Sequence, residues 1–467
     1  MEGHRWLYGW GLGSVALGTA SLLVPLYVVE LGGDPFELGL LGAVAAFVGA
    51  PGAIVWGRLA DRTSNHRSVV VASLLGVAVV LATTPLLPTI PLVILANALL
   101  WLSFAAAGPV LTLLVVADAP EDRWSAEIAA LNGYQGYGWA GGLLLGIAWS
   151  ASVGRLVGPA TSQRYLFVAC AVASAAAALV LLRTMPTPSE RRIRRLNRDR
   201  VERLLSSGRR GIRGATFRFT PTRLYWRTRS LHPDRMAERF TPTLAAYFLG
   251  VVLFFTGFAA FFAPLPLYLT GVGFSSDLVF AFYLIASLGS AAFYGGAGRL
   301  SGEYDVRLLQ TGALGLRSVA MPLVAVVGAA LAAGLLGLLV NGVLFVLIGV
   351  SWALIAVTAG TIVTRLAPPS LRGEALGVYT ALSTLAGGIG SIAGGALASA
   401  ADFVVAFGVA GGVIVAGAAV VLALRGISER TGAGNRTTGA GSAGGTDGDS
   451  SGDRASDDPG VAGGRTE

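Results

Sequence analysis

The charged side chains whose spacing could do chemistry gather in one short turn of the chain. Gly57, Arg58, Asp61 and Arg62 end one apolar run and precede another. These charges either form contacts with other helix ends or only fix the topology of the chain. If a later helix begins near residue 373 on the same face, Asp61 would meet the positive end of its dipole, which is worth about 0.3 to 1 kcal/mol. Arg58 or Arg62 would then pair with Asp118, which ends another apolar run.

The groups that most enzymes use are scattered along the chain. His4, His66 and His232 do not cluster, and Cys170 is the only cysteine. No nucleophile stands beside a base, and no paired acids lie within an apolar run. The sequence therefore predicts no enzyme, no bound metal and no cofactor.

The elements that must position the charged turn are membrane helices. Hydrophobic residues make up 54% of the chain and charged residues 13%, whereas a soluble domain is about a quarter charged. A helix needs about 20 apolar residues to cross a bilayer. Twelve such runs occur, at roughly 6–29, 36–56, 68–90, 92–117, 126–151, 164–183, 243–270, 278–298, 307–329, 332–363, 373–400 and 402–425. The fold class predicted is an all-α membrane protein with twelve transmembrane helices.

The two halves of the chain repeat each other. Residues 25–27 (Pro-Leu-Tyr) recur at 266–268, and residues 57–59 (Gly-Arg-Leu) recur at 298–300, both 241 positions later. Repeated halves are typical of transporters whose two bundles move about a central site. The second copy has decayed, because Gly302 stands where Asp61 would be. We therefore predict two six-helix bundles, at 1–183 and 243–430, with a central loop at 184–242 and a disordered tail at 431–467.

The distribution of arginine predicts the orientation of the chain. Arginine is concentrated in the turns on one side of the runs and in the central loop, while acids dominate the other side. The positive-inside rule then places both termini and the central loop in the cytoplasm of a multi-pass plasma membrane protein. Apolar residues of the central loop recur at roughly helical spacing, which would suit a helix on anionic lipid headgroups. A solvated linker is the alternative, and no nucleic-acid-binding fold accompanies the basic charge.

In this turn and its flanking layout the sequence resembles the major facilitator superfamily of secondary transporters. The resemblance spans about residues 6–425 and includes a Pro-then-Arg turn at Pro120 to Arg123 and again at Pro369 to Arg372. The sequence departs from the family pattern at Thr63, where a glycine is usual, and at Trp139, where exporters often have proline. The resemblance implies a monomer whose halves are latched by charged turns. The latch residues implied are Gly57, Arg58, Asp61, Arg62, Asp118, Arg123, Arg299 and Arg372.

The same resemblance implies a cavity lined by the first, fourth, seventh and tenth helices, with the second, fifth, eighth and eleventh beside them. The candidate cavity residues are Asn97, Trp101, Asn132, Gln135, Trp139, Phe255, Asn341, Trp352 and Tyr379. For each of them, packing in the protein core is the alternative. Asn132, Gln135 and Asn341 are the strongest candidates, because a buried amide needs a partner.

Few charges lie at mid-depth in these helices. Glu30 and Glu127 are candidates for carrying a coupling proton, although each could simply face water at a helix end. Arg317 lies ten residues after Arg307, near mid-membrane, and is expected to pack against a neighbour rather than to bind substrate.

A mostly apolar cavity with a few hydrogen-bonding groups favours a small neutral or amphipathic solute. The function predicted is secondary active transport by alternating access, with protons as the candidate coupling ion. Efflux of hydrophobic compounds is favoured over uptake. Two alternatives stay open, namely an uptake permease of the same fold and a transporter-like sensor or scaffold that moves nothing.

Overall fold

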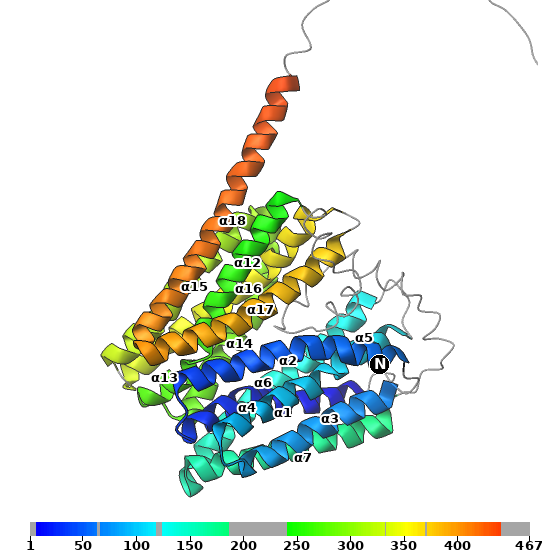
Figure 1. The fold of residues 1–467 in the computed structure, drawn as a ribbon, viewed down its shortest axis with the longest axis vertical. Helices are drawn as coiled ribbons and strands as arrows, with labels where there is room; N and C mark the ends of the chain where they lie inside the picture. Colours follow the sequence, from blue (N-terminus) through cyan, green and yellow to red (C-terminus); the bar gives the residue numbers. More distant parts are fainter. Residues whose placement is uncertain are drawn as a thin grey trace, which may run out of the picture. The chain divides into compact units, whose positions relative to one another are not determined.

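In the computed structural model the chain is an all-helical protein (Figure 1). The structure describes residues 6–62, 66–117, 124–185, 241–331, 333–368 and 371–439. Within these ranges, the side chains of residues 50, 53–62, 109, 113, 116–117, 124–126, 129 and 425–439 are not described. The predicted central loop, 184–242, falls almost wholly outside the described residues, as does most of the predicted tail.

The helices follow the predicted apolar runs closely. The first half contains α1 (Trp6–Glu30), α2 (Pro35–Arg62), α3 (His66–Thr83), the short η2 (Thr84–Leu86), α4 (Ile90–Ala105), α5 (Ala107–Ala117), α6 (Trp124–Val157) and α7 (Pro159–Thr184). The second half contains α12 (Pro242–Phe262), α13 (Leu265–Gly271), α14 (Ser276–Glu303), α15 (Val306–Leu331), α16 (Leu335–Leu366), α17 (Arg372–Ala400) and α18 (Phe403–Gly439). By length and composition, eleven spans among the described residues can cross a membrane, and Pro35–Gly49 is a shorter apolar stretch of α2.

Two of the predicted runs are each divided into two helices. The run at 243–270 becomes α12 and α13, because Pro264 has no N–H to donate to the carbonyl of Ala260. The run at 92–117 becomes α4 and α5, and the proline at position 109 has the same effect on the carbonyl of Ala105.

The compact unit of the fold comprises Met1–Leu424, and Arg425–Glu467 forms a separate unit. α18 continues to Gly439, so it passes the predicted start of the tail at residue 431.

Glycines let the helices of each half approach one another closely. A Cβ placed on Gly142 of α6 would collide with the backbone of α1 at Val15, and would lie 2.6 Å from the nitrogen of Thr19. In the second half, a Cβ on Gly394 of α17 would collide with the backbone of Ala260 on α12. Small residues at such contacts suit helix packing in lipid, where close backbone approach supplies the attraction.

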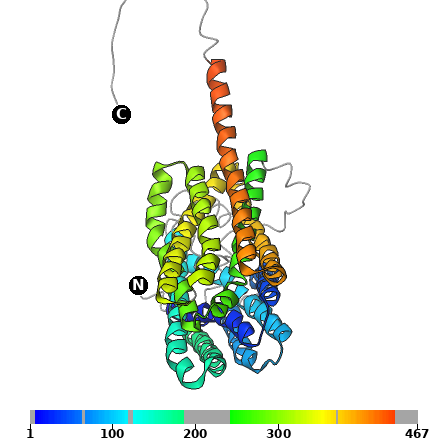
Figure 2. The ribbon, with the colours of Figure 1, turned by 90° about the vertical axis from the view of Figure 1, so that its left-hand side faces the viewer.

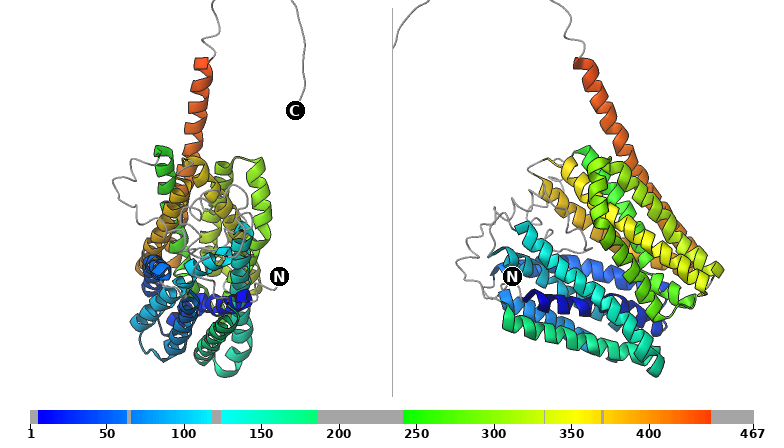
Figure 3. Two further views of the ribbon diagram at one scale, coloured as in Figure 1. Left: turned by 90° about the vertical axis from the view of Figure 1, so that its right-hand side faces the viewer. Right: turned by 180° about the vertical axis from the view of Figure 1, so that it is seen from behind.

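The first-half and second-half helices of the compact unit form two groups (Figures 1, 2 and 3). The groups meet mainly through α2 with α17 and through α6 with α14. The contact of α2 with α17 lies at the end where α2 begins and α17 ends. There the backbone N–H of Phe36 donates to the hydroxyl of Ser399 at 3.0 Å. Away from this end the two groups diverge (Figure 1).

Candidate functional site

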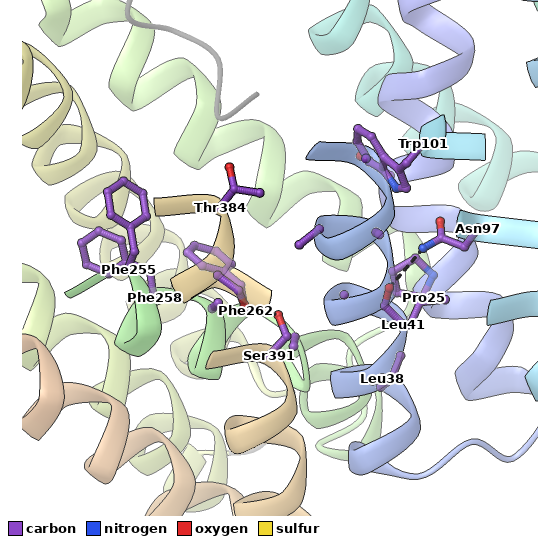
Figure 4. Close-up of a pocket in the computed structure, with 18 of the residues that line it drawn as sticks. Pro25, Leu38, Leu41, Asn97, Trp101, Phe255, Phe258, Phe262, Thr384 and Ser391 are labelled. Atoms are coloured by element: carbon purple, nitrogen blue, oxygen red, sulfur yellow. Dashed lines mark hydrogen bonds between the residues drawn. The ribbon is translucent and has the colours of Figure 1, made fainter. Parts of the chain in front are cut away.

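A cavity of about 300 Å³ lies between the two groups of helices. Its walls come from α1, α2 and α4 of the first half and from α12 and α17 of the second, with single residues from α13, α14 and α16. Figure 4 shows the α2 and α4 residues facing those of α12 and α17 across this space. The cavity therefore lies where the two halves meet.

One wall of the cavity is aromatic. Phe255, Phe258 and Phe262 of α12 follow one another at three- and four-residue spacing, so they share a helix face (Figure 4). Trp352 of α16 completes this wall, with its ring centroid 6.2 Å from that of Phe255 and 6.3 Å from that of Phe258, in edge-on arrangements. Such a wall offers ring faces and edges to a planar solute.

A second wall carries hydroxyl groups. Thr380, Ser383, Thr384 and Ser391 recur along one face of α17 and line the cavity. Each hydroxyl donates to a carbonyl of its own helix; that of Ser391, for example, donates to Gly387 at 2.9 Å. A hydroxyl that donates into its helix keeps its oxygen lone pairs as acceptors. This wall therefore suits a solute that carries O–H or N–H groups.

Asn97 of α4 supplies an amide on the first-half side of the cavity. Its side-chain nitrogen donates to the carbonyl of Leu41 on α2 at 3.3 Å, drawn as a dashed line in Figure 4. Fixing the nitrogen in this way fixes the amide plane, and the amide oxygen retains its capacity to accept a hydrogen bond. Trp101, one helical turn along α4, also lines the cavity.

The other candidate residues lie around this cavity rather than in its lining. Trp139 lies behind Trp101, at 6.4 Å between ring centroids, and Tyr379 lies 6.0 Å from Phe255. Asn132 and Gln135 are half-buried on α6. Asn341 is fully buried on α16, where its side-chain nitrogen donates to Gly337 in its own helix at 2.9 Å. The structure thus brings Asn97, Trp101, Phe255 and Trp352 together at one cavity and leaves these five outside its lining.

The proposed latch falls mostly on residues whose side chains are not described. Gly57, Arg58, Asp61 and Arg62 form the end of α2, and only their helical backbone is described. Asp118 and Arg123 lie outside the described residues. Arg299 is exposed near the end of α14, and Arg372 is half-buried at the start of α17. The latch therefore stays a prediction.

The two candidate proton carriers lie at helix ends. Glu30 is exposed at the last residue of α1. Glu127 is half-buried in the first turn of α6, where a carboxylate also faces the positive end of the helix dipole. Neither glutamate lines the cavity.

Sequence reasoning did not select the part of α2 that closes the cavity. Leu38, Leu41 and Gly42 line it, and a Cβ on Gly42 would lie 2.9 Å from the hydroxyl oxygen of Ser391 on α17. The glycines at 39 and 42 carry the signal, since their three-residue spacing places them on one face of α2. Spacing of this kind marks close helix contact without saying which helix is the partner.

Arg317 of α15 lies directly behind the aromatic wall. Its side chain is 1% exposed, and one terminal nitrogen donates to the carbonyl of Ile348 on α16 at 3.0 Å and to the hydroxyl of Ser351 at 3.4 Å. The guanidinium carbon lies 4.4 Å from the ring centroid of Phe258. The expectation that Arg317 packs against its neighbours is confirmed by these contacts.

Comparison with known proteins identifies the fold. The sequence pattern of the Major Facilitator Superfamily matches residues 9–391. A structure of a variant of the nucleoside transporter NupG is similar, with a TM-score of 0.68 and 15% identity over 91% of this chain and 100% of that one. A bacterial homologue of the human lysosomal transporter Spinster, in an inward-facing and occupied conformation, gives a TM-score of 0.62 and 15% identity over 91% and 96% of the two chains. No curated protein sequence matches the chain.

Proposed function

This chain belongs to the Major Facilitator Superfamily, and from that premise we propose that it carries a small neutral or amphipathic aromatic solute across the membrane by alternating access. The family assigns it to the multi-pass membrane transporters rather than to the enzymes, with a small molecule as its substrate. The identity of the solute, the direction of transport and the coupling ion are the parts we add.

The observation that supports this proposal is the two-sided chemistry of the cavity. The ring faces of Phe255, Phe258 and Trp352 suit a planar apolar group. The hydroxyls of α17 and the amide of Asn97 suit a few hydrogen-bond donors on the same solute. Within the described lining residues there is no charged side chain, so a sugar phosphate or dicarboxylate would find no partner.

The position of the closed contact supports alternating access. α2 and α17 pack where α2 begins and α17 ends, which is the extracellular side by the predicted orientation. The halves would then part on the cytoplasmic side, where the latch residues Asp61, Arg58 and Arg372 lie. We propose that these residues meet when the cavity faces outward, and that the basic central loop binds anionic headgroups on the same side.

Proton-coupled efflux from a plasma membrane is the direction we favour. An apolar solute partitions readily into lipid and has no gradient of its own that would drive efflux. The proton gradient would supply that driving force. Glu127 and Glu30 are the candidate proton carriers. A nucleoside, in which an aromatic base is joined to a sugar that carries hydroxyl donors, also matches both walls and is the solute class named for the structural neighbour NupG.

Reconstitution tests the proposal. The full chain is placed in proteoliposomes, and the fluxes of radiolabelled chloramphenicol and of radiolabelled adenosine are followed under pH gradients of either sign. We expect flux of at least one probe that exceeds protein-free liposomes and collapses on adding a protonophore. The gradient sign that drives accumulation separates efflux from uptake. Absence of gradient-driven flux for both probes would overturn the proposed transport and favour a sensor or scaffold.

A further inference from the structure

A permanent positive charge is buried behind the aromatic wall of the cavity. Arg317 lies near the middle of α15, a helix that contributes no residue to the cavity lining. An arginine stays protonated even in an apolar environment, and placing it at mid-membrane is costly. An arginine at such a position is therefore a candidate for a functional role.

Three aromatic rings separate this charge from the cavity. The guanidinium carbon is 4.4 Å from the centroid of Phe258 and 5.6 Å from those of Phe262 and Trp352. All three rings also line the cavity. The rings of the wall therefore already interact with a cation that belongs to the protein.

This arrangement reverses what an aromatic cavity ordinarily selects. Aromatic walls without an internal charge attract organic cations through the negative faces of their rings. Here the ring faces are engaged by Arg317, and a second cation on the cavity side would be repelled by the first. A solute stacked on Phe258 would hold its own charge roughly 9 Å from the guanidinium, which at an effective dielectric constant of about 20 changes a dissociation constant about twentyfold.

We propose that Arg317 determines the charge selectivity of the cavity, so that it accepts neutral and anionic aromatic solutes and discriminates against organic cations. The inference rests on the proposed function, since it takes the cavity to be the solute site, and it adds the class of solute. Arg317 is a specificity-determining residue that acts through the rings rather than by touching the solute.

A purely structural role for Arg317 predicts something different. Its hydrogen bonds to Ile348 and Ser351 tie α15 to α16. Loss of that tie would weaken binding of every solute alike, whatever the charge of the solute. The ratio between solutes of different charge and equal shape therefore separates the two roles.

The test uses three naphthalene probes of one shape. They are 2-naphthylmethylamine, a cation at pH 7, 2-naphthylmethanol, which is neutral, and 2-naphthoate, an anion. Binding to the full chain in zwitterionic lipid nanodiscs is measured by equilibrium dialysis, and binding to empty nanodiscs is subtracted. For the unaltered protein we expect the amine to bind about twentyfold more weakly than the alcohol, and the carboxylate to bind more tightly than the amine.

Variants then assign the discrimination to the charge. Arg317→Lys keeps the charge and should keep the discrimination, whereas Arg317→Gln should bring the amine to within about threefold of the alcohol, because the repulsion is gone. Arg307→Gln is the matched control; this arginine is on the same helix, about 15 Å away, where it donates to Leu424. It should behave as the unaltered protein.

Several results would overturn the inference. Equal binding of amine and alcohol to the unaltered protein would do so without any variant, which keeps the test decisive if Arg317→Gln does not fold. An equal loss of all three probes in Arg317→Gln would assign Arg317 a structural role. If no probe binds above empty nanodiscs, the aromatic-solute cavity itself is wrong, and that failure is distinct from loss of charge selectivity alone.

Discussion

A single added side chain at Gly395 should shift the transporter towards the conformation that is open where α2 begins. A Cβ on Gly395 of α17 would collide with the carbonyl of Pro35 and lie 3.0 Å from the Cα of Gly39, both on α2. Ordinary contacts of a Cβ begin at about 3.4 Å, so Gly395→Val requires the two helices to separate. Overpacking of this kind costs about 1 to 3 kcal/mol.

The cost falls on one conformation only. The three atoms nearest to the added Cβ all belong to α2, in the other half of the protein. When the halves part at this end, the collision disappears, whereas the packing inside each half is unchanged. A penalty of 1 to 3 kcal/mol then shifts the equilibrium between the two conformations by about 5- to 150-fold.

Distance measurements between spin labels test this shift. Labels at Leu156→Cys, at the end of α6, and Ala400→Cys, at the end of α17, report on the separation of the halves; both native residues are exposed. The background is Cys170→Ala, since the single native cysteine is buried. We expect Gly395→Val to add a longer distance component to the distribution seen without it.

Two glycines of the same helix serve as matched controls. A Cβ on Gly394 would collide with Ala260 inside its own half, so Gly394→Val should lower stability without lengthening the distance. A Cβ on Gly387 would meet nothing within 4 Å, so Gly387→Val should leave the distribution unchanged. An unchanged distribution in well-folded Gly395→Val, or the same lengthening in Gly394→Val, would refute the assignment of this contact as the closure between the halves.

Two further substitutions test the latch and the cavity. In the proposed latch the charge of Asp61 meets the helix dipole and arginines, each contact being worth about 0.3 to 1 kcal/mol. Asp61→Asn would remove that charge, so we expect flux in proteoliposomes to fall about fivefold or more with normal membrane insertion, and unchanged flux would contradict the latch. Asn97→Leu keeps the number and branching of the side-chain heavy atoms but removes the amide from the cavity, so 2-naphthylmethanol should bind about three- to tenfold more weakly while naphthalene is unaffected. Equal effects on both solutes would show that Asn97 acts through packing.

The sequence predicted the helices well because a helix is the stable structure for a long apolar run in a bilayer. In a bilayer the backbone must satisfy its hydrogen bonds within the segment, so an apolar run of about 20 residues becomes a helix. The breaks after α4 and α12 were missed because a proline in an apolar run can either end the helix or be accommodated inside it. Pro264 divides a run, whereas Pro25 and Pro322 are accommodated inside α1 and α15.

The cavity was predictable only in part. Asn97, Trp101, Phe255 and Trp352 lie on the helices that the family resemblance assigned to the centre, and they line the cavity. Asn341 shows why polarity alone does not place a residue there, because its amide nitrogen finds a partner in its own helix at Gly337. Ser391 and Gly42 were missed because they depend on which helices touch across the halves. That property belongs to one conformation and has no counterpart in a local pattern.

The repeat relates the two main contacts between the halves, which nevertheless differ in the atoms that they pack together. Gly395 and Gly146 are 249 positions apart, as are Pro369 and Pro120, so they occupy equivalent places in α17 and α6. Their partners, Gly39 of α2 and Phe280 of α14, are equivalent by the spacing of 241. Glycine thus meets glycine backbone on one side and a buried aromatic ring on the other.

A ring can turn or slide within its contact, whereas two backbones in contact have no side chain to rearrange. The backbone contact of α2 with α17 therefore has to separate as a unit, while the contact at Phe280 can persist through small displacements. This difference makes Gly395 rather than Gly146 the position at which one added methyl group most directly opposes closure.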